Sequence, residues 1–134
     1  MSNSNVLKFK DAWTPPPTLG QNSHKHWRHK HPDEQNANLI GWTSANASRY
    51  GAQDVPDMPV LVAVIHWEKK SRKKDADNAL GTLKHLVDGI CSGIGIDDRQ
   101  LVTSMAFQKV DHEKRGFTEI TIRPATAEER SIAA

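Results

Sequence analysis

The stretch Val60-Leu61-Val62-Ala63-Val64-Ile65-His66-Trp67 is the clearest strand in the chain. Its residues are apolar on both alternations, a pattern that predicts a strand with both of its faces covered. A run of lysines follows this strand directly, and a helical pattern follows the lysines. The segments on either side of the strand then decide the fold class.

The segment after the strand reads as a helix, a second strand, a turn and a third strand. Residues 75–90 place apolar side chains at helical spacing, and Asp75 or Asp77 can cap the helix start. Residues 101–110 and 117–123 read as strands, joined by a charged turn at 111–116. We expect these two strands to pair as a β-hairpin.

The segment before the strand is harder to interpret. Residues 6–9 predict a short strand, and Trp13-Thr14-Pro15-Pro16-Pro17 predicts an extended path, because proline restrains its neighbours. Pro32-Asp33-Glu34 resembles a helix start, and residues 38–50 can continue that helix. Residues 51–59 are then a connection.

The order is therefore strand, helical region, strand, helix and β-hairpin, which predicts an α+β fold with a mixed sheet flanked by helices. A length of 134 residues fits one domain, 1–134, with loose tails at 1–5 and 124–134. No apolar run reaches the ~20 residues of a membrane helix. A polar start without a signal-peptide core, and Cys91 as the single cysteine, favour a cytoplasmic location.

Positive charge is concentrated in two places, although the formal net charge is only +2. Five cations occupy the six positions from 69 to 74, namely Lys69, Lys70, Arg72, Lys73 and Lys74. A second basic cluster, rich in histidine, spans residues 24–31. Two such patches indicate an anionic partner such as nucleic acid, or else two solvated loops.

Four aspartates lie at the junctions between the predicted elements. Asp75 and Asp77 lie between the basic run and the helix, and Asp97 and Asp98 lie just before the next strand. We expect the two junctions to meet at one end of the sheet. Mg2+ prefers carboxylate oxygens, and a metal beside a basic run predicts phosphodiester hydrolysis. The alternative is that the first pair caps the helix and the second pair lies in a surface turn.

The ordered motifs resemble the RusA family of Holliday junction resolvases. They are Arg72-Lys73-Lys74-Asp75-Ala76-Asp77-Asn78, then Lys84, then Asp88-Gly89-Ile90, then Ile96-Asp97-Asp98-Arg99-Gln100-Leu101-Val102. The resemblance covers residues 60–123, about half of the chain. Pro15-Pro16-Pro17, Asn22, Trp27 and Arg28 are similar to the family's proline-rich start.

The resemblance implies a RusA-like fold and a homodimeric, Mg2+-dependent endodeoxyribonuclease, in which Mn2+ can substitute for Mg2+. Such an enzyme nicks a four-way DNA junction symmetrically, in recombination and repair. It implies that Asp75, Asp77 and Asp98 bind the metal, with Asp97 as a secondary candidate. Beside the basic run, Asn22, Lys25, Trp27 and Arg28 are further candidates for DNA contact, and Trp27 can either stack on an unpaired base or pack against the protein.

Lys84 resembles the family's catalytic lysine but departs from its spacing. The family places this lysine one helical turn after the second aspartate, whereas Lys84 follows Asp77 by seven residues. Either an extra turn is inserted, or a lysine of residues 69–74 takes the role. Two other functions remain open: a nuclease-dead nucleic-acid-binding module of the same fold, and a general flap or fork nuclease.

Overall fold

One mixed sheet of four strands organises the chain, in the order β1-β4-β2-β3. A computed structural model describes residues 4–19 and 27–134, without the side chains of Trp27, His29, Ala76 and Asp77. The strands are β1 (Leu7–Asp11), β2 (Pro59–Trp67), β3 (Thr103–Val110) and β4 (Phe117–Pro124). The helices described are α1 (Trp27–Ser48), α2 (Ala76–Gly81), α3 (Lys84–Ile94) and α4 (Ala127–Ala133).

The predicted hairpin is wrong, because β2 lies between the two strands that were expected to pair. β2 pairs in parallel with β3 and antiparallel with β4. The loop that joins β3 to β4 passes over the end of β2, where the Asp111 N–H donates to the Trp67 carbonyl at 2.7 Å. The chain therefore forms an α+β domain with a mixed sheet, as expected, but with a different strand order.

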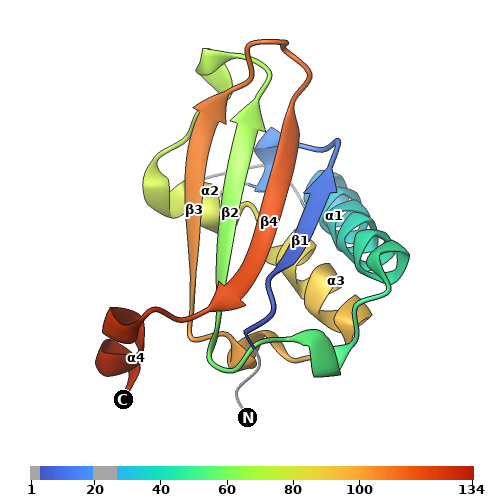
Figure 1. Cartoon of the computed structure of the whole chain (residues 1–134). Helices are drawn as coiled ribbons and strands as arrows, with labels where there is room; N and C mark the ends of the chain where they lie inside the picture. Colours follow the sequence, from blue (N-terminus) through green and yellow to red (C-terminus); the bar gives the residue numbers. More distant parts are fainter. Residues whose placement is uncertain (1–3, 20–26) are drawn as a thin grey trace.

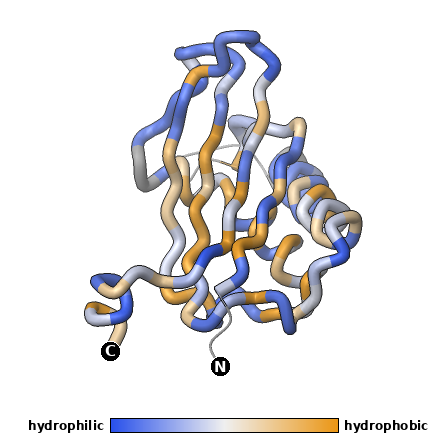
Figure 2. Tube along the Cα trace, in the orientation of Figure 1, coloured by the Kyte–Doolittle hydropathy of each residue, from blue (hydrophilic) through white to orange (hydrophobic). Residues whose placement is uncertain are grey.

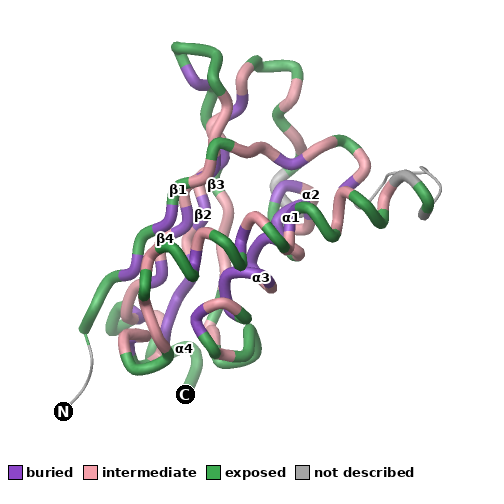
Figure 3. Tube along the Cα trace, turned by 90° about the vertical axis from the view of Figure 1, so that its right-hand side faces the viewer, coloured by how far each residue is buried: buried purple, intermediate pink, exposed green. Residues whose placement is uncertain are grey.

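The helices cover one face of the sheet. α1 and α3 pack against each other behind the strands, and the described part of the chain places no helix over the opposite face (Figures 1 and 3). The β2 side chains that face the helices, Leu61, Ala63, Ile65 and Trp67, are fully buried. On the other face Val60 is buried, whereas Val62, Val64 and His66 are half-buried, so the expectation that both faces of β2 are covered is wrong for most of the strand.

Two glycines allow α1 and α3 to approach closely. A Cβ atom added at Gly89 would lie 2.0 Å from the carbonyl oxygen of Asn38 on α1. A Cβ atom added at Gly41 would lie 2.2 Å from the carbonyl oxygen of Leu86 on α3. Each contact is with rigid helix backbone, so a side chain at either position would force the two helices apart.

Helix α1 begins earlier than the proline suggested. Proline is common at the first position of a helix, but α1 begins at Trp27 and contains Pro32 in its interior. The adjacent Asp33 has a different role from the one expected at a helix start, because the Thr18 hydroxyl donates to its carboxylate. This bond ties α1 to the short helix at Pro17–Leu19.

The C-terminal segment is a capped helix rather than a loose tail. The Thr126 hydroxyl accepts the Glu129 N–H at 3.2 Å, and the Glu129 carboxylate accepts the Thr126 N–H at 2.8 Å. Arg123 on β4 pairs with Glu129 at 2.8 Å. These reciprocal bonds satisfy the first free amides of α4. At the other end, residues 1–3 of the expected N-terminal tail lie outside the described residues.

Within the described residues, no helix combines the length and the apolar character that crossing a membrane requires. Apolar residues instead gather between the sheet and the helices, while the upper ends of the strands are mainly hydrophilic (Figure 2).

The close approach of α1 and α3 gives a stability prediction. Alanine normally favours a helix over glycine by about 1 kcal/mol. We expect Gly89→Ala instead to lower the free energy of unfolding by about 1–3 kcal/mol, because its Cβ meets the Asn38 carbonyl. Urea denaturation measures this change. Ser92→Ala on the exposed side of α3 is the control and should stay within about 0.5 kcal/mol of the parent. A more stable Gly89→Ala variant would contradict the close approach.

Candidate active site

The two acidic segments enter the fold at opposite ends of a parallel strand pair. Asp75 lies on the path that leaves the C-terminal end of β2, and Asp98 lies just before the N-terminal end of β3. Because β2 and β3 run in the same direction, α2 and α3 carry the chain back along the sheet between these points. The expectation that both junctions meet at one end of the sheet is therefore wrong.

Asp75 precedes α2 without capping it. Its backbone occupies the N-cap position, but its carboxylate accepts no hydrogen bond from the helix, and its side chain is exposed. Asp77 lies in the first turn of α2, and its side chain is not among those described. Asp75 is therefore free of the structural role that the alternative interpretation gave it.

Asp97 has the structural role instead. Its carboxylate accepts the Arg99 N–H at 2.9 Å and forms an ion pair with the Arg99 guanidinium at 2.9 Å. The hydrogen bonds from the Arg99 side chain and backbone hold the pKa of Asp97 well below its usual range. This carboxylate caps the short helix Asp98–Gln100, as the surface-turn alternative predicted.

Asp98 faces Asp88 across a small open hollow of about 280 Å³, which we call the acidic hollow. The two carboxyl groups share a hydrogen bond. Partial burial raises the pKa of Asp88, and the hydrogen bond and charge of Asp98 raise it further. The lining of the hollow is Asp88, Cys91, Ser92, Ile96, Asp97 and Asp98.

The sequence interpretation did not include Asp88 among the site residues. The available signal was its position on α3, one helical turn after Lys84, on the face that Lys84 shares. The partner Asp98 comes from the segment after α3, so only the folded chain shows that the two carboxyl groups touch.

Lys84 lies close enough to Asp88 for its charge to act on that carboxyl group. It is the exposed first residue of α3, and its positive charge acts on Asp88 to oppose the rise in pKa. The predicted continuous helix from 75 to 90 is broken here: α2 ends at Gly81, and α3 begins at Lys84. The Thr82 hydroxyl donates to the Ala79 carbonyl at 2.6 Å within the break. Residues 78–81 complete α2, and Thr82 and Leu83 form the break before Lys84, so the spacing between Asp77 and Lys84 contains both a helical turn and a helix break.

Burial and the three aspartates of the acidic hollow act together on Cys91. Burial is the larger cause, and the charges of Asp98, Asp88 and Asp97 add to it, so the pKa of the Cys91 thiol rises to about 12. A thiol with this pKa stays protonated at neutral pH and is not a nucleophile. The reactive or metal-binding groups of the hollow are therefore its carboxylate oxygens, not the thiol.

The basic run divides into cations that face solvent and an arginine with structural partners. Lys69, Lys70 and Lys73 are exposed. Arg72 instead donates to Glu68 at 2.6 Å and to the Pro15 carbonyl at 2.6 Å. Its guanidinium also lies 5.1 Å from the centre of the Trp67 ring. The structure thus gives Arg72 internal contacts, where the sequence suggested a DNA contact.

Gln108 on β3 fixes the segment that leads to Asp75. Its side-chain oxygen accepts the Lys74 N–H and the Trp67 indole N–H, each at 2.8 Å. Its side-chain amide donates to the Lys74 carbonyl at 2.7 Å. One half-buried side chain therefore anchors the chain immediately before the Asp75–Asp77 motif to the sheet.

Asn22 and Lys25 lie outside the described residues, as does the side chain of Trp27. Arg28 is exposed in the first turn of α1 and has an interaction partner. Their predicted roles stay predictions.

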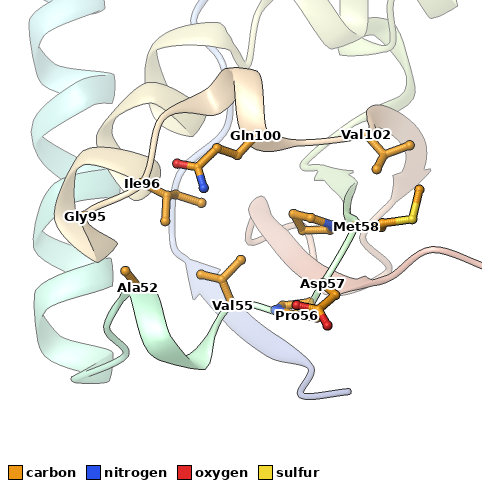
Figure 4. Close-up of a pocket in the computed structure, with 10 residues that line it drawn as sticks. Ala52, Val55, Pro56, Asp57, Met58, Gly95, Ile96, Gln100 and Val102 are labelled. Carbon is orange, nitrogen blue, oxygen red and sulfur yellow. The ribbon is translucent and has the colours of Figure 1, made fainter. Parts of the chain in front are cut away.

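A larger pocket of about 540 Å³ lies next to the acidic hollow, between the segment before β2 and the end of α3 (Figure 4). Most of the side chains that line it are apolar. Its Gln100 side chain already accepts the Asp97 N–H at 2.9 Å. This pocket contains no pair of facing acids, so it is a poorer candidate for hydrolysis than the acidic hollow.

Within the described side chains, which exclude Asp77, no group of three histidine, cysteine or acidic residues is placed to hold a metal ion. The structure brings Asp98 and Lys84 to Asp88 and does not bring Asp75 to that group. Comparison of the chain with protein-family models and with curated proteins finds no match.

The Gln108 anchor gives a second prediction. Gln108→Ala removes three hydrogen bonds, which should lower the free energy of unfolding by about 2–3 kcal/mol. The Lys74 amide should also exchange its hydrogen faster. Gln100→Ala, which removes a single exposed bond, is the matched control and should leave the Lys74 amide protected. Equal stability losses together with an unchanged Lys74 amide would show that Gln108 does not anchor the motif.

Proposed function

We propose that the chain is a Mg2+-dependent, structure-specific DNA endonuclease that resolves four-way junctions by paired nicks, with Mn2+ as a substitute metal. The observation that carries this proposal is the contact between the carboxyl groups of Asp88 and Asp98 in an open hollow beside Lys84. Two carboxylates this close repel each other unless a proton or a cation lies between them.

The residues of the acidic hollow fit a hard divalent cation. Asp88 and Asp98 offer oxygen ligands, and the open hollow leaves room for water and a phosphate oxygen. Asp77, whose side chain is not among those described, remains a proposed ligand on the strength of the resemblance, whereas Asp75 lies outside the acidic hollow. Asp97 is the weakest candidate ligand, because Arg99 already engages its carboxylate.

When bound, Mg2+ would supply Lewis acidity that activates water and offsets charge on the phosphate. The protein's own part is to hold the reacting groups. Asp98 is fixed by the helix cap at Asp97, and Asp88 is fixed by α3. Lys84, exposed one turn before Asp88, is available to donate hydrogen bonds to a phosphoryl oxygen.

Paired nicks on a junction require two sites, so we propose a homodimer. A four-way junction has approximate two-fold symmetry, which a two-fold dimer matches. Phe107, with 54% of its surface exposed on the helix-free face of the sheet, is one apolar residue available to a second copy. Size-exclusion chromatography with light scattering decides whether the chain is a dimer.

We expect wild-type protein to nick a labelled four-way junction in Mg2+ and to be inactive in chelator. Asp98→Asn and Asp88→Asn should abolish nicking, and Lys84→Ala should slow it by ~10²–10³ at saturating protein. Glu128→Gln, an exposed acid on α4, is the control and should cleave at the wild-type rate.

Flap and fork substrates run in parallel separate a resolvase from a general nuclease. Junction binding without nicking in either Mg2+ or Mn2+ would support the alternative function, a nuclease-dead nucleic-acid-binding module. Full activity of Asp98→Asn would remove the acidic hollow from the mechanism. Full activity of Asp75→Asn beside an inactive Asp98→Asn would confine the metal ligands to the acidic hollow.

A further inference from the structure

The loop between β3 and β4 and the segment after β2 enclose a second hollow, of about 600 Å³, which we call the lysine hollow. Lys69 and Lys70 line it from the segment after β2, and His112 and Lys114 line it from the loop. These segments are some forty residues apart in sequence and lie side by side at the top of the sheet in Figure 1. The same end is hydrophilic in Figure 2.

The acids that line this hollow form ion pairs with arginines, whereas its lysines form no ion pair with any described acid. Glu68 pairs with Arg72 at 2.6 Å, and Asp111 pairs with Arg115 at 3.3 Å. Within the described residues, Lys69, Lys70 and Lys114 take part in no ion pair with an acid. The hollow therefore presents a net positive charge to solvent.

The hollow stays positively charged when Glu113, which also pairs with Arg115, is included in the count. Five cations, at 69, 70, 72, 114 and 115, then stand against three carboxylates, at 68, 111 and 113. The difference is +2, with His112 counted as neutral.

Asp111 holds the loop in a defined shape. Its carboxylate accepts the Glu113 N–H at 3.1 Å and the Arg115 N–H at 2.9 Å, and the Lys114 N–H donates to its carbonyl at 3.0 Å. Burial pushes the pKa of Asp111 up, but these hydrogen bonds and Arg115 together lower it to about 2. The loop is therefore fixed at neutral pH, and Lys114 is presented beside Lys69 and Lys70.

We propose that the lysine hollow binds the sugar-phosphate backbone of a DNA arm, with Lys114 completing the basic run from across the hollow. Lysines act as point charges toward phosphate, and the described lining has no phenylalanine, tyrosine or tryptophan ring for a base to stack on. Binding of this kind is independent of sequence and sensitive to salt. The inference rests on the proposed function in taking DNA as the partner.

The test is binding of the 134-residue chain to labelled duplex and to labelled four-way junction, in chelator, by fluorescence anisotropy over a series of KCl concentrations. We expect Lys114→Ala to lower the slope of log K against log salt by about 0.9, and Lys69→Ala with Lys70→Ala to lower it by twice that amount. Lys8→Ala, an exposed lysine on the edge strand β1, is the matched control and should leave the slope unchanged. Thermal unfolding checks that each variant is folded.

An unchanged slope for folded Lys114→Ala, or an equal fall for Lys8→Ala, would overturn the proposal. Poly-glutamate and unlabelled duplex, added at equal charge, are compared as competitors of labelled DNA. Equal displacement by the two would also overturn the proposal, in favour of an acidic peptide as the ligand. If Lys114→Ala reduces the slope but the wild-type protein shows no Mg2+-dependent cleavage, DNA binding by the lysine hollow is supported and the proposed nuclease activity is refuted. If Lys114→Ala leaves the slope unchanged and the wild-type protein cleaves junctions normally, DNA binding by the lysine hollow is refuted and the proposed nuclease activity stands.

Discussion

The structure depends on the pairing of β2 with β3 in parallel and with β4 antiparallel. Parallel pairing requires a crossover, and α2 and α3 provide it on the face that α1 also covers. The crossover returns the chain to the start of β3 and places Asp98 beside Asp88 on α3. The central position of β2 also forces the β3–β4 loop over Trp67, which brings Lys114 to the basic run.

Much of the fold follows from local patterns. The apolar run of β2 and the apolar stripe of α3 predict elements that the structure confirms, because burial of a strand or a helix face shows directly in residue spacing. Strand order does not show in this way. Residues 103–110 and 117–124 look like a hairpin because a short turn joins them, but the buried strand β2 competes for both and pairs with each.

The candidate site could be predicted only in part for the same reason. Asp75, Asp77 and Asp98 stand out because they lie at junctions between elements, and junctions are visible in sequence. Asp88 is an ordinary helix residue until folding places Asp98 against it. Arg72 is one cation among five in sequence, and only its contacts with Glu68 and Pro15 separate it from the exposed lysines.

The central claim is that the acidic hollow holds a divalent cation, and paramagnetic broadening by Mn2+ in NMR spectra tests it most directly. Titration of Mn2+ into 15N-labelled protein should broaden the amide signals around Asp88 and Asp98 first and in a saturable way, and excess Mg2+ should restore them. The effect should disappear in Asp98→Asn. Broadening that is equally strong at exposed acids such as Glu128, or that Asp98→Asn leaves unchanged, would contradict the account.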